Sequence, residues 1–402
     1  MVLLRAEPRI IKNNQNTVKR MSKNNPKILF VANVDKEHIL KFHVPTIKML
    51  RDKNWIVDVA CAGNENIPYC SNRYVLHYER TPFTPKLFKG ISELCKIIKE
   101  NEYDIIYCHT PVGGLAARIA SIKARKKGSK VVYFAHGFHF YKGAPLLNWI
   151  IYYTIEKILS FFTDSIITIN DEDFEMTKKK FRNCTPYKIN GIGIDTEKFK
   201  ENTDNKDIRK EYREAINIPE DATVLIYLAE LIKNKNQFFL LRVVKKLIDD
   251  GNNNIYLLLA GVDHADGQVE KYAEELNIAN NVRYLGWRND IRNLYCMSDI
   301  CTASSIREGF GLNIAEAMLC SIPVVAAKNR GHNTIIKDGY NGYLIPQGDE
   351  NAFAEKILSL INNEKEREMI ISNASLDAEK YTTNVVLKDL YNILSSHIQE
   401  EK

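Results

Sequence analysis

The chain alternates short apolar runs with helical patterns, and it does so twice, on either side of a polar, charge-rich stretch at residues 196–222. The strand-like runs before this stretch are residues 27–32, 55–60, 105–108, 131–135 and 165–169. Those after it are residues 224–228, 255–261, 282–285, 300–303 and 324–326. Because helical patterns separate the runs, each half predicts a parallel sheet covered by helices on both faces. We therefore expect an α/β protein with two doubly wound, Rossmann-like domains.

The length of 402 residues fits two domains of ordinary size better than one compact core. We expect an N-terminal domain at residues 27–196 and a C-terminal domain at residues 197–383. Residues 1–26 are polar and basic and show no periodic apolar face, so we expect a disordered basic tail. Met21 lies near the end of this tail, which leaves both Met1 and Met21 open as the functional start.

With 45% hydrophobic and 26% charged residues, the composition is that of a globular protein. Its eight cysteines form no CxxC pair and no metal-ligand spacing, which favours reduced thiols and a cytoplasmic location. No signal peptide opens the chain, and no stretch of about 18 uncharged apolar residues predicts a spanning helix.

Net charge is divided unevenly along the chain. Residues 1–200 contain 33 Lys and Arg against 19 Asp and Glu, a net charge of +14, whereas residues 201–402 contain 23 against 31, a net charge of −8. A basic first half suggests an anionic partner. The chain shows no nucleic-acid recognition motif, so we expect an anionic membrane surface or a phosphorylated acceptor and no nucleic acid. A solvated basic surface without a partner is the alternative.

The segment at residues 305–318 is the most informative about function. Glu308 and Glu316 lie eight positions apart, with Gly309 and Gly311 between them and a helix predicted to start near Leu312. The glycines leave room for a ligand, and the free N–H groups and positive dipole end of the helix suit a phosphate. This layout suits a ligand with a central diphosphate and hydroxyls at both ends, such as a nucleotide sugar. An exposed helix glutamate with an ion-pair partner is the alternative for Glu316.

The surrounding residues resemble the donor-site signature of glycosyltransferase family 4, a group of retaining enzymes with the GT-B fold. The matching pieces, in the order of the family, are residues 294–299, 308–311, 316–318, 322–326 and 338–342. In the first half, residues 106–118 and 133–140 resemble the branch that builds bacterial capsules and exopolysaccharides. The likeness spans residues 27 to about 395. It implies an acceptor-side N-terminal domain, a donor-binding C-terminal domain, a cleft between them, and a last helix at residues 384–402 that can pack back on the first domain.

The resemblance also implies roles for single residues. Glu308 is expected to act in catalysis by contacting hydroxyls of the donor sugar, and Glu316 is expected to bind the ribose hydroxyls. Backbone N–H groups of the loop between them are expected to hold the diphosphate, from residues Gly309, Phe310, Gly311 and Leu312. His136, just after a predicted strand, is expected to lie close to the transferred sugar. A histidine that only orders its loop is the alternative there.

Lys235 occupies the place of the lysine that contacts the donor diphosphate in the family. Glu230 stands where the family usually has arginine, which puts the second cation in doubt. Lys233 or a cation from the first domain could replace that arginine, and weak donor binding is the third possibility.

No metal or other cofactor is expected. Asp171, Glu172 and Asp173 superficially resemble a DxD metal site, but Asn170 or Asp171 is better explained as a helix cap with acidic residues in the first turn. The aromatic helix predicted at residues 146–162 could press onto a membrane or pack inside the domain, and packing is favoured.

Taken together, we expect a cytoplasmic retaining glycosyltransferase on the inner face of the cell membrane. It would transfer a sugar, from a donor that we expect to be linked to UDP, to a lipid-linked glycan in cell-surface polysaccharide synthesis. The alternatives are a non-hydrolysing UDP-sugar 2-epimerase, which shares the fold, and a non-catalytic partner that binds nucleotide sugars.

Overall fold

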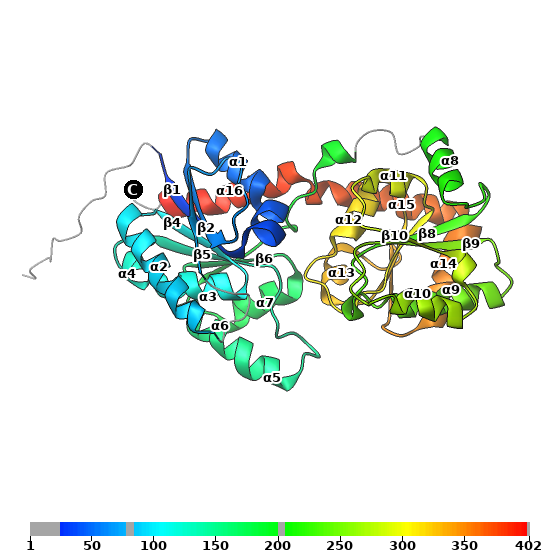
Figure 1. Cartoon of the computed structure of the whole chain (residues 1–402), viewed down its shortest axis with the longest axis horizontal. Coiled ribbons are helices and arrows are strands. Elements are labelled where there is room, and N and C mark those ends of the chain that lie inside the picture. The colour runs from blue at the N-terminus through cyan, green and yellow to red at the C-terminus, as the bar shows by residue number, and fades with distance from the viewer. Residues whose placement is uncertain (1–24, 78–83, 200–205, 400–402) are drawn as a thin grey trace, which may run out of the picture.

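The structure is a computed structural model, and it describes residues 25–77, 84–199 and 206–399. Residues 25 and 26 are the only part of the expected tail within this range, and Met21 lies outside it. Two α/β domains lie side by side, and the last helix runs from the second domain back along the first (Figure 1).

The N-terminal domain is built on a parallel sheet with the strand order β3-β2-β1-β4-β5-β6-β7. The strands are β1 (Lys27–Val34), β2 (Ile56–Ala62), β3 (Asn72–Val75), β4 (Ile105–His109), β5 (Lys130–Ala135), β6 (Ser165–Thr168) and β7 (Thr185–Lys188). The helices are η1 (Asp35–His43), α1 (Val44–Asp52), α2 (Pro85–Asn101), α3 (Pro111–Ala120), α4 (Ile122–Arg125), α5 (Leu146–Asn148), η2 (Trp149–Tyr153), α6 (Thr154–Leu159), η3 (Ser160–Phe162) and α7 (Asp171–Lys180). The order reverses between β1 and β4, and open parallel sheets bind ligands beyond the carboxyl ends of strands at such a point.

The C-terminal domain repeats this plan with the strand order β10-β9-β8-β11-β12-β13. The strands are β8 (Thr223–Leu228), β9 (Ile255–Ala260), β10 (Val282–Gly286), β11 (Ile300–Ala303), β12 (Val324–Ala327) and β13 (Tyr343–Ile345). The helices are α8 (Lys206–Ala215), η5 (Lys233–Lys235), α9 (Gln237–Asp249), α10 (Gln268–Glu275), η6 (Ala279–Asn281), α11 (Ile291–Cys296), α12 (Leu312–Leu319), α13 (Arg330–Ile335), α14 (Glu350–Asn362) and α15 (Glu364–Ala378). Here the order reverses between β8 and β11.

These two sheets confirm the predicted fold class. All ten predicted strands are present, with ends within two residues of those expected. Their central members are almost completely buried, as expected for apolar runs in sheets covered on both faces. The strands that the sequence did not predict, β3, β7 and β13, lie at sheet edges, where shorter and more polar strands are common.

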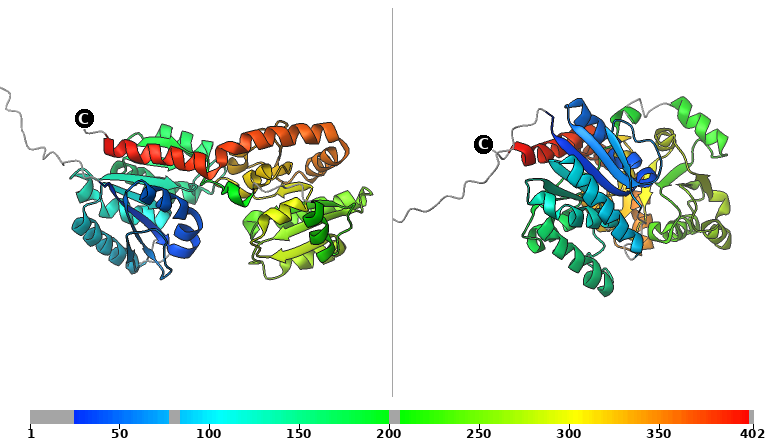
Figure 2. Two further views of the ribbon diagram at one scale, coloured as in Figure 1. Left: turned by 90° about the horizontal axis from the view of Figure 1, so that it is seen from above. Right: turned by 60° about the vertical axis from the view of Figure 1, so that its left-hand side comes forward.

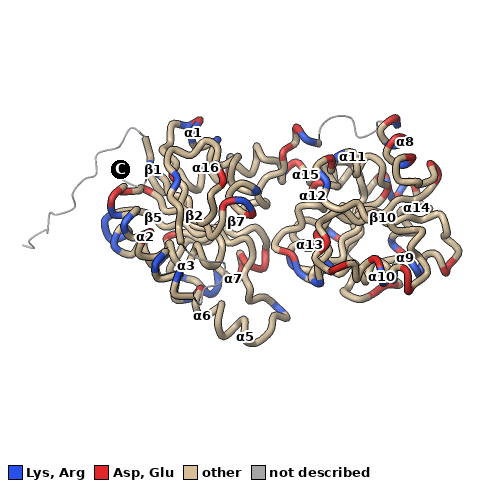
Figure 3. The backbone as a smooth tube through the Cα atoms, viewed as in Figure 1, with Lys and Arg blue, Asp and Glu red and all other residues tan. Residues whose placement is uncertain are grey.

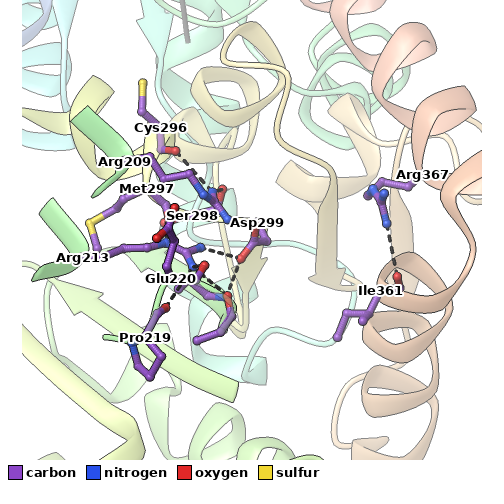
Figure 4. Close-up of polar contacts among 12 residues, drawn as sticks. Arg209, Arg213, Pro219, Glu220, Cys296, Met297, Ser298, Asp299, Ile361 and Arg367 are labelled. Atoms are coloured by element: carbon purple, nitrogen blue, oxygen red, sulfur yellow. Dashed lines mark hydrogen bonds and ion pairs between the residues drawn. The ribbon is translucent and has the colours of Figure 1, made fainter. Parts of the chain in front are cut away.

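The polar stretch at residues 196–222 is not a simple linker, because α8 belongs to the C-terminal domain. The Arg213 guanidinium is buried and bonds Asp299 Oδ2 at 2.9 Å, the Met297 carbonyl at 3.0 Å and the Glu220 carbonyl at 2.8 Å. Arg209 bonds the other oxygen of Asp299 at 2.5 Å (Figure 4). A charge-rich sequence therefore folds as a helix that is held by a buried polar network.

The chain crosses between the domains twice. The first crossing leads into η4 (Thr196–Lys198), and the second passes from η7 (Glu379–Tyr381) into α16 (Thr383–Gln399). The two crossings are hydrogen-bonded to each other, because Ile194 N–H donates to the Tyr381 carbonyl and Thr383 N–H donates to the Ile194 carbonyl, each at 2.9 Å. α16 then lies along the first domain (Figure 2), where Tyr391 packs against Trp55 with ring centroids 6.3 Å apart.

The two domains differ in the distribution of their charged residues. Lys and Arg gather at the outer edge of the N-terminal domain around α2 and α3, and Asp and Glu are frequent around α9 and α10 (Figure 3). None of the helices in the described ranges is long and apolar enough to span a membrane.

Candidate functional site

A cavity of about 610 Å³ lies between the domains, beyond the carboxyl ends of the strands. The wall contributed by the C-terminal domain, here called the C-terminal wall, is formed by residues 228–230, Lys235, residues 308–313 and Glu316. Its N-terminal wall includes His38, Lys41, Phe42, Thr110, His136, Gly137 and His139. The cavity therefore brings together most of the residues that the sequence singled out, from both domains.

The loop before α12 forms the centre of the C-terminal wall. Gly311 is the residue that precedes the helix, and its φ of +107° belongs to the region that favours glycine. α12 then starts at Leu312, the position that the sequence predicted. Because the first N–H groups of a helix lack partners within the helix, this end of α12 suits an anion.

Lys235 and Glu308 face each other across the same wall. Lys235 Nζ donates a hydrogen bond to Glu308 Oε1 at 2.5 Å. The η5 turn is also bonded to the segment that follows β11, since Ser304 Oγ donates to the Lys235 carbonyl at 2.7 Å and Asn234 Nδ2 donates to the Arg307 carbonyl at 2.9 Å. These bonds fix the lysine relative to the loop before any ligand arrives.

Glu316 lies one helical turn further along α12 and lines the cavity. Burial raises the pKa of its carboxyl to about 7, an effect that Lys198 partly offsets. Within the described ranges, no hydrogen bond or ion pair joins this carboxyl to another side chain. It is therefore available to a ligand, and near neutral pH it exists in both protonation states.

Lys233, one of the residues expected to replace the missing arginine, lies away from the cavity. Lys233 is exposed and does not line the cavity, whereas Glu230 does line it. Lys41, on η1 of the first domain, is the further lysine that lines the cavity among the described residues. A cation from the first domain is thus the arrangement that the geometry favours.

His136 follows β5 and lies where the two domains come into contact. A Cβ atom on Gly309 would lie only 2.2 Å from the His136 carbonyl oxygen, so only glycine allows this approach. The ring of Phe310 packs against Tyr381 with centroids 5.4 Å apart, and a Cβ atom on Gly191 would lie 2.6 Å from that ring. The loop thus contacts both the first domain and the crossing between domains.

A buried ion pair closes the contact between the domains, and the sequence did not reveal it. Arg330 Nη1 lies 2.7 Å from Asp173 Oδ1, and Nη2 of the same guanidinium donates to the Phe138 carbonyl at 2.8 Å. Asn170 caps α7, as the sequence suggested, by accepting from Asp173 N–H at 2.9 Å. Its Nδ2 also donates to the Gly309 carbonyl at 3.0 Å. The residues that follow β6 therefore cap the start of α7 and also hold the first domain against the second.

The chain matches known transferases over nearly its full length. Residues 27–170 match the family model described as "Glycosyl transferase 4-like", and residues 208–377 match that described as "Glycosyl transferases group 1". The Bacillus subtilis protein EpsD, which is named as a glycosyltransferase, is 39% identical over 92% of this chain and 97% of its own length.

Two further proteins extend the likeness. An Escherichia coli protein named as a UDP-Gal:α-D-GlcNAc-diphosphoundecaprenol α-1,3-galactosyltransferase is 26% identical over 69% of this chain and 71% of its own length. The crystal structure of Anabaena HepE in complex with UDP and glucose superposes with a TM-score of 0.74 at 21% identity, covering 92% of this chain and all of that one. The superposition shows the GT-B fold. The chain therefore belongs to glycosyltransferase family 4 and is a glycosyltransferase.

Proposed function

We propose that this enzyme is a retaining glycosyltransferase that transfers a sugar from a UDP-linked donor to a lipid-linked glycan, in the synthesis of a cell-surface polysaccharide. The observation that carries the proposal is the C-terminal wall of the cavity. It sets the Lys235–Glu308 pair, the start of α12 and the free carboxyl of Glu316 along one surface.

A nucleoside diphosphate sugar has groups that match this wall in order. The Glu316 carboxylate can accept hydrogen bonds from two neighbouring ribose hydroxyls. The N–H groups at the start of α12 can bind the diphosphate, and Lys235 can offset the charge that develops on it as it leaves. Glu308 can accept hydrogen bonds from hydroxyls of the sugar. We propose that these groups, with Lys41, hold the leaving diphosphate without a metal ion.

The distribution of acidic residues supports retention of the anomeric configuration by attack from the front face. The acidic residues that line the cavity are Glu230, Glu308 and Glu316, and all three come from the C-terminal wall. None of the cavity-lining residues in the described ranges places a carboxylate on the acceptor side as a nucleophile. In the proposed step, the bond from the anomeric carbon to the phosphate oxygen breaks, the acceptor oxygen bonds that carbon, and the acceptor proton passes to the phosphate.

The lipid acceptor is supported by an apolar face on the first domain. The segment from α5 to η3 packs one side against the domain through Trp149, Tyr152 and Tyr153, which confirms the favoured packing reading for that side. Its other side is exposed and carries Leu146, Leu147, Ile150, Ile158 and Phe161. We call this the exposed apolar face.

A basic helix adjoins the exposed apolar face. Arg125 of α4 donates to the Phe161 carbonyl at 2.8 Å, and the neighbouring Lys123, Lys126 and Lys127 are exposed. Apolar side chains beside lysines suit the surface of an anionic bilayer, so we propose a peripheral location on the inner face of the cell membrane.

The proposal is tested by incubating the purified enzyme with single UDP-sugars and lipid-linked oligosaccharides extracted from bacterial membranes. We expect UDP release and a product enlarged by one α-linked sugar only when both substrates are present. Glu308→Gln should lower turnover by about 100-fold or more, because it removes an interaction with the reacting sugar. Glu355→Gln, at an exposed position of α14, is the matched control.

Two outcomes would contradict the proposal. Conversion of the UDP-sugar without an acceptor would indicate the epimerase alternative. Tight binding of UDP without turnover on any lipid acceptor would indicate a non-catalytic protein.

A further inference from the structure

Four histidines of the N-terminal domain converge on one point beside the cavity. His38 and His43 come from η1, His109 is the last residue of β4, and His136 follows β5. One ring nitrogen from each of these side chains lies within 4.8 Å of one from every other. We call this group the histidine cluster. The four histidines come from three segments of the chain, so no spacing motif in the sequence predicts the cluster.

A π-helix brings two of the four rings together. An α-helix turns by about 100° per residue, so side chains five positions apart point about 140° away from each other. The wider turn of a π-helix closes i→i+5 hydrogen bonds and places such positions one above the other. η1 has this geometry from Asp35 to His43, and Nε2 of His38 lies 3.2 Å from Nε2 of His43. The unusual helix thus aligns these two imidazoles.

The other two rings carry nitrogens that lack partners. Both ring nitrogens of His109 and Nε2 of His136 are buried without a hydrogen bond. His109 is completely buried. Leaving a buried polar atom unpaired costs about 1–3 kcal/mol, so such atoms call for an explanation. Within the cluster, the hydrogen bond between His38 and His43 gives these two rings a partner, but it leaves the nitrogens of His109 and Nε2 of His136 unpaired.

The backbone next to His109 is strained, at the residue that caps α3. Thr110, the next residue, has a φ of +62°, which is rare for a β-branched side chain. Its hydroxyl donates to the His109 carbonyl at 2.5 Å and accepts from Gly113 N–H at 3.3 Å. Strained backbone persists where the surrounding structure enforces it, and it is concentrated at functional sites.

We propose that the histidine cluster binds one divalent transition-metal ion, and that zinc is the ion it suits best. Zinc bonds imidazole nitrogens at about 2.0–2.1 Å, so the nitrogens of a tetrahedral site lie about 3.4 Å apart. Nε2 of His38 and Nε2 of His43 already have nearly this separation. The nitrogens of the other pairs lie within 4.8 Å of one another, so the rings would move closer together on binding one ion.

The surroundings select against calcium and magnesium. The rings of Phe30, Tyr107 and Phe134 pack around the cluster, with centroids 4.3 to 6.3 Å from its members. No carboxylate belongs to the cluster. Calcium and magnesium require oxygen ligands, whereas zinc, copper and nickel accept imidazole alone.

The site would be reached from the cavity. His38 and His136 line the cavity wall, while His43 and His109 do not. An ion held by the cluster would therefore lie at the edge of the cavity on the acceptor side. His136 can serve the cluster through Nε2 and a sugar hydroxyl through Nδ1, because the two nitrogens are separate groups. The inference stands on the cluster alone and does not require the proposed transfer reaction.

The test uses the full-length enzyme without a histidine tag. The protein is stripped with a chelator, dialysed against Zn²⁺ or Co²⁺, and its bound metal is measured by mass spectrometry. We expect one ion per chain, and for Co²⁺ the intense visible absorption of a tetrahedral site. X-ray absorption of the zinc form should show nitrogen ligands of the imidazole type and no sulfur.

His43→Gln and His109→Gln should each weaken zinc binding by about 100-fold or more, since loss of an outer-shell partner alone costs 10–100-fold. His264→Gln, in an exposed loop of the second domain, should leave the affinity unchanged. Unchanged affinity in both cluster variants would overturn the proposal. So would wild-type protein that retains no ion, and this readout does not depend on whether the variants fold. Neither result bears on transferase activity, which is measured separately.

Discussion

Lys235 Nζ lies 2.5 Å from Glu308 Oε1, so the cation expected at the diphosphate and the carboxylate expected at the sugar are hydrogen-bonded to each other before a donor binds. Both side chains are partly exposed to the cavity, at 24% and 17%. The pair therefore holds both groups in place while leaving each accessible to a ligand.

Replacing Lys235 by Met should lower kcat by about 10²–10³-fold, because the charge on the leaving diphosphate loses a preorganised cation. Lys235→Arg should restore part of the rate. Steady-state kinetics with a saturating acceptor measures the effect. A rise in KM with unchanged kcat would show that Lys235 only binds the ground state. Lys233→Met is the matched control, because Lys233 is exposed and lies outside the cavity wall.

Replacing Arg330 by Met should destabilise the protein by about 3–5 kcal/mol, because Asp173 would keep a buried charge without a partner. The side chains of this pair are only 5% and 1% exposed. Urea denaturation of the single variants and of Arg330→Met/Asp173→Asn measures the coupling between them, and the double variant should recover part of the loss. Lys48→Met breaks an exposed pair with Asp52 and should cost less than about 1 kcal/mol. Equal losses of stability in Arg330→Met and Lys48→Met would contradict the conclusion that Arg330 and Asp173 form a buried ion pair.

The buried carboxyl of Glu316 should make stability depend on pH. Its pKa is raised from 4.5 to about 7 in the folded protein, so the folded state binds the proton more tightly than the unfolded state. Stability from this group is complete below pH 4.5, falls as the pH rises toward 7, and changes little above that. The total is at most about 3 kcal/mol. Glu316→Gln removes this dependence, so the melting temperature of the variant relative to wild type should rise between pH 5 and pH 8. A constant difference across this range would show that the carboxyl titrates normally.

Replacing Leu147 or Ile150 by Glu should weaken binding to anionic vesicles by about tenfold or more, since burial of one such side chain contributes roughly 1.5–3 kcal/mol. Flotation with phosphatidylglycerol vesicles measures the effect. Leu376→Glu, at an exposed apolar position of α15, is the matched control and should bind as wild type does. Binding should also fall with added salt, which screens Lys123, Lys126 and Lys127 in and beside α4. Equal loss in all three variants would argue against the exposed apolar face as the contact.

Local patterns in the sequence predicted the central strands and the loop between Glu308 and Glu316, because both depend on residues that are close along the chain. The edge strand β3 escaped prediction because its sequence, Asn72–Val75, is half exposed and does not alternate clearly. The sequence did not predict the π-helix η1 either, since its apolar positions fit no regular period.

Contacts between distant segments could not be predicted in this way. Arg330 and Asp173 are 157 positions apart, and they meet only when the two domains are placed together. The histidine cluster likewise depends on the strand order, which brings the ends of β4 and β5 beside η1. Lys233 lies outside the cavity because the η5 turn points its side chain elsewhere, and a sequence motif does not specify that direction.

The paired chain crossings at Ile194 and Thr382 are joined by backbone hydrogen bonds, so the two connections between the domains form one joint and not two independent linkers. Phe310 contacts Tyr381 at this joint, and Gly309 lies against the His136 carbonyl of the first domain. The loop before α12 is therefore held by the joint and by the first domain at once, so a change in the angle between the domains would reach the cavity wall directly.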